Sequence, residues 1–413
     1  MRTLPMKFIA SGLLCLLGAI VARPAIAESV DITAVFRPDG SAPQKNQFVN
    51  TTPESGYCLI YKPDCTALRI FSIRLPLRID SARPMRPSSE PRDNAMFQVP
   101  SQWRAVDVTN TVSGETARVE VRIAGIGSTY FLSDTVQSLT GAATAVAGHH
   151  ALWGSSWLGA PSPCLGTYVG FYGSTSYGFF WRTPVQSACV KTARFTIPSM
   201  YYQYLDFAYE LRTPNPLSMT AGIYTGSFTY SLGPGADFDF GDVMLPQDNQ
   251  LTFNFNLDVD HNLKVQVPPG GHRIQLEPQG GWQAWLNDGR KPRRLFRDQT
   301  VNLWTSSPFK MTLECGEPLG NTCSVRNGAG HQVPLDVAVS LPFGLTDGSG
   351  NAVNRRPLRL DGSGTELFKP SLYIDRKPST LHFEIKADAV EQMLEQAGST
   401  YSGTVTVVWD SQV

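Results

Sequence analysis

Ala397-Gly398-Ser399-Thr400-Tyr401-Ser402-Gly403-Thr404-Val405-Thr406-Val407 is the second copy of a pattern that occurs twice in this chain of 413 residues. The first copy is Ala221-Gly222-Ile223-Tyr224-Thr225-Gly226-Ser227-Phe228-Thr229-Tyr230, which begins 176 residues earlier (397 − 221 = 176). Each copy has Ala-Gly, one or two spacer residues, Tyr-x-Gly and an alternating run, and each follows a Phe-x-Ile, at 195–197 and 383–385. This repetition predicts a duplicated β module, in which the same kind of strand closes each of two domains.

Apolar and polar residues alternate in many parts of the chain. Runs of this kind occur at 118–123, 251–260 and 335–341. A period of two with one polar face is typical of a half-buried antiparallel strand. Thirty prolines and 36 glycines separate such runs, as turns between short strands require. The sequence therefore predicts an all-β protein built from β-sandwich domains.

The domain boundary is expected near Gly233-Pro234-Gly235-Ala236, where the first Tyr-x-Gly strand has ended. This predicts a first domain at 28–232, a linker at 233–249 and a second domain at 250–413. The alternative is one long sandwich with a large insertion. One helix is predicted from Asp388, as its cap, to Gly398, immediately before the last strand.

Residues 1–27 have the features of a secretory signal peptide. Arg2 and Lys7 precede an apolar run, and Ala25-Ile26-Ala27 offers small residues for cleavage. Cleavage after Ala27 would leave 413 − 27 = 386 residues, with 35 − 3 = 32 basic and 35 acidic side chains. The net charge near −3 argues against nucleic acid as a partner, and we expect none.

The exported chain would retain six cysteines, and an even number predicts disulfides. Spacing favours pairing between neighbours: Cys58 with Cys65, Cys164 with Cys189, and Cys315 with Cys323. A zinc site is the alternative, but Cys-x-x-Cys pairs and nearby histidines are absent from the sequence. We expect no metal and no cofactor.

An aromatic segment from His149 to Tyr204 is interleaved with Gly and Ser. Aromatic rings combine a flat apolar face with a polar group, which suits sugar stacking or protein contact. Trp153 and Trp157 are expected in a loop, and an arginine follows Trp181 and could face an acidic ligand. The candidate ligand-binding residues are Trp153, Trp157, Tyr172, Trp181 and Arg182. The alternative is that these aromatic residues fill the sandwich core.

Motifs of common enzymes are absent from the sequence, including Gly-x-Ser-x-Gly and His-Glu-x-x-His. No catalytic residue is predicted, and the protein is expected not to be an enzyme. The rival hypothesis is a secreted β-sandwich carbohydrate-active enzyme, or a free carbohydrate-binding protein. Such an enzyme would need two carboxylates in one cleft, and turnover of labelled polysaccharides would reveal it.

Three features in order resemble the two-domain tip adhesins of chaperone–usher fimbriae, the group of CFA/I-type and cable-pilus initiator subunits. Asp31-Ile32-Thr33-Ala34-Val35-Phe36-Arg37-Pro38 is similar to their short opening strand. A large N-terminal domain precedes a smaller one, and the sequence stops directly after a terminal strand that ends at Trp409. The resemblance covers the layout of the mature chain but only some thirty residues of motif.

The resemblance implies two immunoglobulin-like sandwiches, the second an incomplete pilin-type sandwich that lacks its last strand. Val405, Val407 and Trp409 would then line the groove that accepts a donor strand. The implied partners are a periplasmic chaperone, an outer-membrane usher, a neighbouring pilin subunit and a host receptor or glycan. The implied location is a fimbrial tip on the cell surface, reached through the periplasm. Residues 30–36 also alternate and could instead be a donor strand, as in an internal subunit.

Overall fold

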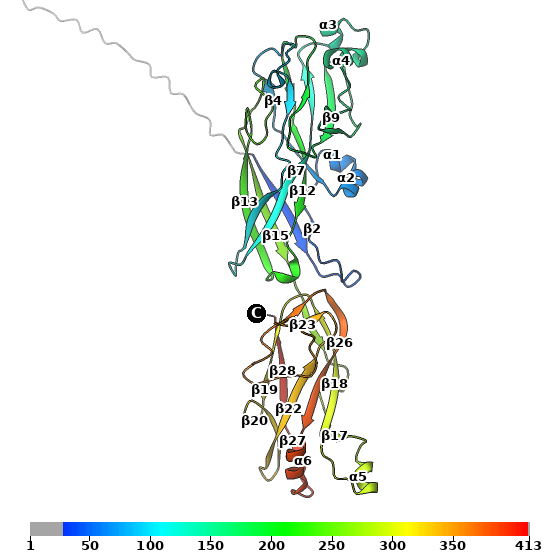
Figure 1. Ribbon diagram of the computed structural model, residues 1–413, viewed down its shortest axis with the longest axis vertical. Coiled ribbons are helices and arrows are strands. Elements are labelled where there is room, and N and C mark those ends of the chain that lie inside the picture. The colour runs from blue at the N-terminus through cyan, green and yellow to red at the C-terminus, as the bar shows by residue number, and fades with distance from the viewer. Residues whose placement is uncertain (1–27, 412–413) are drawn as a thin grey trace, which may run out of the picture.

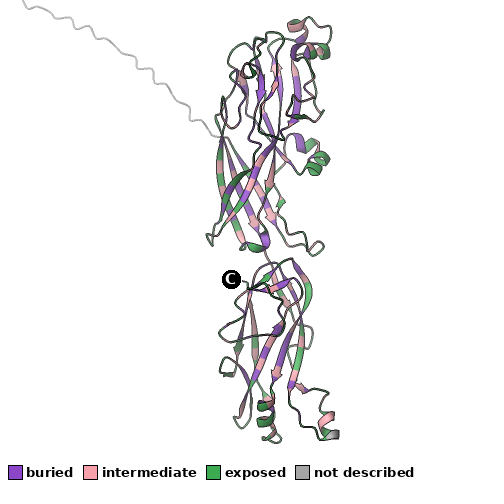
Figure 2. Cartoon of the chain, in the orientation of Figure 1, coloured by how far each residue is buried: buried purple, intermediate pink, exposed green. Residues whose placement is uncertain are grey.

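The computed structural model describes residues 28–411, so the predicted signal peptide lies outside the described residues. Two hydrophobic cores lie end to end along the molecule (Figure 1). The first unit holds the core that runs from Val30 to Val259. The second unit holds a core whose members, half-buried ones included, begin at Leu263. Buried residues alternate with less buried ones along many strands of both units (Figure 2), so the all-β prediction of packed sandwich layers is confirmed.

The first unit contains fifteen strands and four short α-helices among the described residues. They are β1 (Glu28–Phe36), β2 (Val49–Asn50), α1 (Tyr57–Ile60), α2 (Lys62–Leu68), β3 (Phe71–Leu75), β4 (Ile79–Ser81), β5 (Ala95–Phe97), β6 (Arg104–Asn110), β7 (Thr116–Leu132), α3 (Val136–Thr140), α4 (Ala145–Trp153), β8 (Leu165–Gly166), β9 (Ser176–Arg182), β10 (Cys189–Lys191), β11 (Met200–Tyr202), β12 (Leu205–Arg212), β13 (Gly222–Ser231), β14 (Met244–Pro246) and β15 (Gln250–Val259).

The long strand β7 organises the first unit. Its first part pairs with β6, its middle with β12, and its last part with β9 and β11. The register of β12 against β7 shifts between Ala208 and Tyr209, so the pairing of these two strands is irregular at that point. The half of the unit that carries β9, α3 and α4 lies farthest from the second unit (Figure 1).

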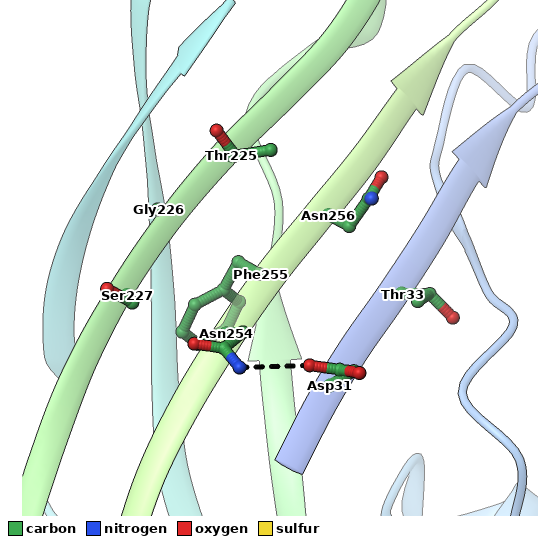
Figure 3. Close-up of a pocket in the computed structure, with 8 residues that line it drawn as sticks. All are labelled: Asp31, Thr33, Thr225, Gly226, Ser227, Asn254, Phe255 and Asn256. Atoms are coloured by element: carbon green, nitrogen blue, oxygen red, sulfur yellow. Dashed lines mark hydrogen bonds between the residues drawn. The ribbon is translucent and has the colours of Figure 1, made fainter. Parts of the chain in front are cut away.

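Strand β15 belongs to the first unit. It lies between β13, with which it pairs antiparallel, and β1, with which it pairs parallel. Figure 3 shows these three strands side by side, with Asn254 between Ser227 and Asp31. The inward residues of β15 are all buried in the first core: Leu251, Phe253, Phe255, Leu257 and Val259.

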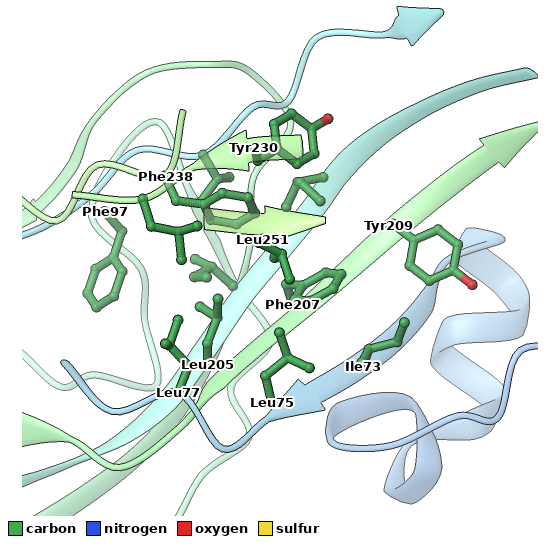
Figure 4. Packing of buried hydrophobic residues seen from close by; sticks show 14 of the residues in the cluster. Ile73, Leu75, Leu77, Phe97, Leu205, Phe207, Tyr209, Tyr230, Phe238 and Leu251 are labelled. Atoms are coloured by element: carbon green, nitrogen blue, oxygen red, sulfur yellow. The ribbon is translucent and has the colours of Figure 1, made fainter. Parts of the chain in front are cut away.

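The expected linker at 233–249 is part of the first core. Phe238, Phe240, Val243 and Met244 are fully buried, and Figure 4 shows Phe238 packed beside Tyr230 and Leu251. Acidic residues of this stretch are also engaged, because the Arg92 guanidinium forms ion pairs of 2.7 Å with both Asp239 and Asp242. The structure therefore places the boundary at 260–262, not at 233–249, and the second unit does not begin at 250.

The two copies of the Tyr-x-Gly pattern have different roles. The first copy forms β13, which lies in the middle of its sheet between β6 and β15 and does not close the unit. The second copy is divided into β27 and β28, which pair with different strands. Similar local sequences thus occupy different positions, and the expectation that each unit closes with the same strand is wrong.

The second unit contains thirteen strands and two helices among the described residues. They are β16 (Leu263–Gln266), β17 (Glu277–Pro278), α5 (Gln283–Asp288), β18 (Leu295–Thr305), β19 (Lys310–Cys315), β20 (Pro318–Leu319), β21 (Thr322–Asn327), β22 (Gln332–Ser340), β23 (Leu345–Asp347), β24 (Arg356–Pro357), β25 (Phe368–Pro370), β26 (Ile374–Ile385), α6 (Ala387–Leu394), β27 (Tyr401–Ser402) and β28 (Val405–Asp410).

Two layers enclose the second core. One layer has the order β16-β18-β26-β22-β21-β20, and the other contains the pairs β19-β28 and β23-β25. A bridge between Phe309 and Phe368 joins those two pairs. The predicted helix is confirmed as α6, but its N-cap is Lys386 rather than Asp388, and it ends at Leu394, before Gly398. Asp388 instead lies in the first turn, where its carboxylate interacts favourably with the positive end of the helix dipole.

All three predicted disulfides are confirmed. Cys58 is bonded to Cys65, Cys164 to Cys189, and Cys315 to Cys323. The first joins α1 to α2, the second anchors the segment before β8 to β10, and the third joins β19 to β21. Each closes a short loop, so each constrains local structure within one unit.

His261 connects the two units. Its Nε2 lies 2.9 Å from the Met219 carbonyl oxygen of the first unit, and its Nδ1 lies 3.1 Å from Ser306 Oγ of the second. Burial lowers the pKa of His261, which favours the neutral ring. In that form Nε2–H donates to Met219 and Nδ1 accepts from Ser306, so one side chain hydrogen-bonds both units.

Candidate functional site

Three of the five candidate ligand-binding residues are core residues. Trp157 and Trp181 have 0% of their surface exposed and Trp153 has 3%. Trp181 stacks on Trp157 with ring centroids 5.1 Å apart, and its Nε1 donates to the Trp157 carbonyl oxygen at 2.7 Å. The prediction that these tryptophans contact a ligand directly is therefore not supported, because the structure buries their rings. Their rings fill the space between β7, β9 and α4, because such large apolar surfaces are stabilised by removal from water.

Trp153 belongs to helix α4 and not to the predicted loop. It takes part in a buried chain of hydrogen bonds with Tyr130 and His149. Trp153 Nε1 donates to the Tyr130 hydroxyl at 2.9 Å, and that hydroxyl lies 2.7 Å from His149 Nδ1. Nε2 of His149 lies 2.8 Å from the Gly173 carbonyl oxygen. Burial lowers the pKa of His149, so a neutral ring that donates to Gly173 and accepts from Tyr130 satisfies every group.

This buried chain positions a segment that we name the aromatic hairpin, residues 165–182, in which β9 is mostly buried and the stretch before it is largely exposed. Within it, Tyr168, Phe171 and Tyr172 have 77%, 61% and 52% of their surface exposed. Backbone pairing orders the segment, because Gly178 N–H donates to the Phe171 carbonyl oxygen at 2.8 Å. A Cβ on Gly178 would lie 2.7 Å from the Phe171 ring, so the glycine lets this ring lie against the strand. The hairpin therefore presents ordered aromatic rings to solvent.

Only Tyr172 of this exposed group was among the predicted site residues. Tyr168 and Phe171 lie in the aromatic segment, but the sequence did not distinguish them from the buried rings around them. The signal that could have separated them is the glycines at 166, 170 and 173, which interrupt the sequence around the exposed rings, as glycine does where a strand is weak.

Arg182 lies at the other end of the hairpin, paired in register with Leu165. It lines a hollow of about 130 Å³ together with an ion pair between Arg122 and Glu210, whose N–O distance is 2.7 Å. Among residues 28–411, no carboxylate forms an ion pair with Arg182. Arg182 is five residues along β9 from Tyr177, the neighbour of Tyr172, which is roughly 17 Å of strand. The structure therefore does not bring Tyr172 and Arg182 into one pocket.

Lys191 is a buried cation beside this region. Only 4% of the residue is exposed, and its Nζ donates to Ser155 Oγ and to the Ser156 carbonyl oxygen, each at 2.7 Å. No ion pair to a carboxylate compensates this charge within the described part of the chain. Burial lowers the pKa of Lys191 to about 8.

The pKa of Lys191 predicts a rise in stability at alkaline pH. In the unfolded chain a lysine titrates near pH 10.4, so between about pH 8 and 10.4 the unfolded state binds more protons. The free energy of unfolding should therefore increase with pH in this window, by at most about 1.4 kcal/mol per pH unit from this residue. Urea unfolding of wild type and Lys191→Met at several pH values measures it. Tyrosines titrate in both proteins, so subtracting one free energy of unfolding from the other removes their contribution. Parallel curves of the free energy of unfolding against pH would contradict the prediction.

In the second unit, β28 carries the predicted acceptor residues at a sheet edge. Its hydrogen-bonded partner among the described strands is β19, with Val407 opposite Leu313 and Trp409 opposite Met311. Val405, Val407 and Trp409 pack against the second core but stay half-buried, and the Trp409 ring lies 5.5 Å from that of Phe309. The other edge of β28 pairs with no strand within residues 28–411.

A polar hollow of about 430 Å³ lies on the outer face of β1, β13 and β15 (Figure 3). Short hydroxyl, amide and carboxyl side chains surround it, and Asn254 donates to Asp31 at 3.0 Å. The sequence reasoning did not identify this hollow. Apart from the buried Phe255, which also lines it, its residues on β15 are the solvent-facing members of the alternation that buries Phe253 and Phe255.

Between residues 28 and 411, no group of three or more His, Cys, Asp or Glu side chains is placed to hold a metal ion. In the same range, no helix has the length and apolar character needed to cross a membrane.

Comparison with solved structures finds adhesive subunits of bacterial fimbriae. The chain is similar over most of its length to tip adhesins of chaperone–usher fimbriae. The match to a chain from the chaperone–tip adhesin complex of CFA/I fimbriae spans 94% of this chain and 97% of that chain, at 9% identity and a TM-score of 0.25. For CfaE, the adhesive subunit of CFA/I fimbria of enterotoxigenic Escherichia coli, the coverages are 93% and 92%, with 10% identity and a TM-score of 0.24.

A third likeness is to the CsuC–CsuE chaperone–tip adhesion subunit pre-assembly complex from archaic Csu pili of Acinetobacter baumannii. This match spans 94% of the present chain and 99% of the other chain, at 10% identity and a TM-score of 0.22. No protein-family model matches the sequence, and no curated protein matches it. The proteins found are adhesins rather than enzymes.

Proposed function

We propose that this protein is a fimbrial tip adhesin, in which the first unit binds a receptor and the second unit joins it to a chaperone–usher fimbria. The observation that carries the proposal is the open edge of β28. Val405, Val407 and Trp409 point toward the second core but remain half-buried. A complete sandwich would cover these side chains with a further strand.

An unpaired strand edge above a partly exposed core promotes aggregation. A strand added along Val405–Trp409 would pair with the open edge of β28, and alternate side chains of that strand would cover Val407 and Trp409. In the proposed assembly a periplasmic chaperone supplies this strand first. The N-terminal extension of the neighbouring pilin then replaces it at the outer-membrane usher.

The position of β1 supports a tip subunit over an internal one. Residues 28–36 pair with β15 on one side, and Ala34 and Val35 pair with β2 on the other. The inward residues of β1 are buried in the first core: Val30, Ile32, Ala34 and Phe36. A strand built into its own unit in this way is not available to complete another subunit, so residues 30–36 are not proposed as a donor.

The aromatic hairpin is the proposed receptor surface. Tyr168, Phe171 and Tyr172 are exposed, and Tyr172 bridges to Tyr177 of β9, a strand in the half of the first unit that is farthest from the second (Figure 1). Flat rings with hydroxyl groups favour stacking on sugars or contact with protein loops. Arg182, at the other end of the hairpin, could add a contact to an acidic group of an extended ligand. This position of the hairpin, away from the unit proposed to join the fimbria, supports the proposal.

Replacing Phe171 and Tyr172 together with Ala is expected to abolish adhesion and leave the fold intact. Buried interface aromatics typically contribute about 2 kcal/mol or more each, which is about thirtyfold in affinity. A glycan and matrix-protein binding screen with the first unit would identify the ligand, and titration of the variant against it gives the loss. The fragment must extend to Asp260, because 28–232 would remove β15 from the core.

Val112→Ala is the matched control for this experiment. Val112 is 90% exposed in the first unit and lies in the turn between β6 and β7. Its truncation should leave binding unchanged. Equal binding by wild type and the Phe171/Tyr172 variant would show that the aromatic hairpin is not the receptor surface.

A further inference from the structure

Helix α5 exposes large apolar side chains outside both hydrophobic cores. Leu286 is 71% exposed and Trp282, immediately before the helix, is 37% exposed. Trp285 is half-buried, with its ring centroid 6.0 Å from that of Trp282. Among the described residues, neither tryptophan nor Leu286 belongs to the second core or to the side chains packed on it. These residues therefore form an apolar surface outside both cores.

The chain around α5 holds this apolar surface away from the sandwich. It leaves the sheet after β17, turns through α5 and returns at β18. Gly289 ends the helix in the left-handed conformation, with φ of 64°. Figure 1 shows α5 projecting from the second unit at the end far from the first. The surface is thus a convex projection rather than a groove.

Basic residues follow directly behind the apolar projection. From 282 to 297 the sequence has five basic residues and one acidic residue, a net charge of 5 − 1 = +4. Arg294 pairs with Glu384 at 2.8 Å. Arg290, Lys291 and Arg293 are exposed, and among the side chains that the structure describes none of the three forms an ion pair with a carboxylate. The cations are therefore available to an anionic partner.

We propose that residues 282–297 bind the surface of an anionic phospholipid bilayer. Tryptophan and leucine at a short projecting helix enter the boundary between headgroups and acyl chains, and flanking Arg and Lys contact lipid phosphates. The convex shape favours this partner over a protein, because protein interfaces bury a broad patch of roughly 800 Å² on each side. Neither signal is strong alone, but apolar insertion and charge together give stable attachment. The inference does not depend on the proposed adhesin function.

Flotation with lipid vesicles tests the proposal. The mature chain and all its variants are prepared in the same soluble form. Each is mixed with vesicles of phosphatidylcholine alone or of equimolar phosphatidylcholine and phosphatidylglycerol. We expect flotation with the anionic vesicles and little with phosphatidylcholine. Trp282→Ala with Leu286→Ala should weaken binding by about tenfold or more. Each Gln substitution at Arg290, Lys291 or Arg293 should weaken it by about fivefold, and added salt should act in the same direction.

Two matched variants in the same unit control for general effects. Phe343→Ala removes an apolar side chain that is 93% exposed elsewhere, and Lys377→Gln removes an exposed charge. Both should float like wild type. All variants should keep the wild-type melting temperature, because α5 lies outside the core. If the Trp282/Leu286 double variant does not fold, Leu286→Gln replaces it in the flotation experiment. Absence of flotation, equal flotation with both vesicles, or equal binding by the α5 and control variants would overturn the proposal.

Discussion

Expressed without a chaperone, residues 260–413 should aggregate or be degraded, and a donor strand should rescue them. The expectation follows from β28, which has β19 as its paired neighbour and leaves Val405, Val407 and Trp409 half-buried. Fusing the N-terminal extension of the neighbouring pilin after Val413 through a flexible linker presents the strand at millimolar effective concentration. Soluble yield and gel filtration should then report a monomer, and co-expression with the cognate chaperone should have the same effect.

A pair of adjacent substitutions separates a strand-acceptor edge from an ordinary last strand. Val407→Asp places a carboxylate on the face of β28 that meets the core, whereas Thr406→Asp places one on the exposed face. Only Val407→Asp should lose chaperone binding, because a buried carboxylate without a partner is costly. If residues 260–413 fold as a stable monomer with no added strand, the donor-strand hypothesis fails. The protein would then be a free two-unit binder.

Trp157→Ala should destabilise the first unit by about 3–5 kcal/mol, the range for large-to-small substitutions of buried aromatics. The ring is fully buried and contacts aromatic rings on several elements, with centroids 4.9 Å from Tyr130, 4.7 Å from Phe179 and 5.1 Å from Trp181. Its removal would leave a cavity beneath the aromatic hairpin. Since a single domain is stable by only about 5–15 kcal/mol, much of the first unit's stability would be lost. Urea unfolding of residues 28–260 measures the change.

Tyr172→Ala is the matched comparison for Trp157→Ala. Both residues are aromatic and lie close in sequence, but Tyr172 is 52% exposed. Its truncation should change the free energy of unfolding by less than about 1 kcal/mol, as is usual for surface positions. The core assignment would be contradicted if Trp157→Ala kept wild-type stability and lost adhesion, which is the behaviour of a ligand contact.

Features that depend on neighbouring residues could be predicted from the sequence. Alternation along 251–259 shows a strand with one buried face, because successive side chains of a strand point to opposite sides whatever its partners are. The three disulfides join cysteines within 7, 25 and 8 residues of each other, so chain proximity already favours those pairs. Helix α6 follows from the apolar face at Val390 and Met393, although its cap was misplaced.

The unit to which a strand belongs was beyond the sequence. Residues 250–259 read equally well as the first strand of a second domain, and only their pairing with β1 and β13 assigns them to the first. The acidic and glycine-rich appearance of 233–249 likewise concealed Phe238 and Phe240, which are fully buried. Strand pairing joins residues far apart in the chain, so local periodicity contains no information about the partner.

The sequence by itself determined that this chain is built of strands, where its cysteines pair, and which segment concentrates aromatic rings. Only the tertiary structure decided which of those rings meet solvent. Trp157 and Trp181 are buried while Phe171 and Tyr172 are exposed, although all four lie between 157 and 181. Likewise, the run at 405–409 alternates as any strand would, and its edge position follows from where β19 lies. Burial and edge position are properties of packed layers, because they depend on what the rest of the chain places against each face.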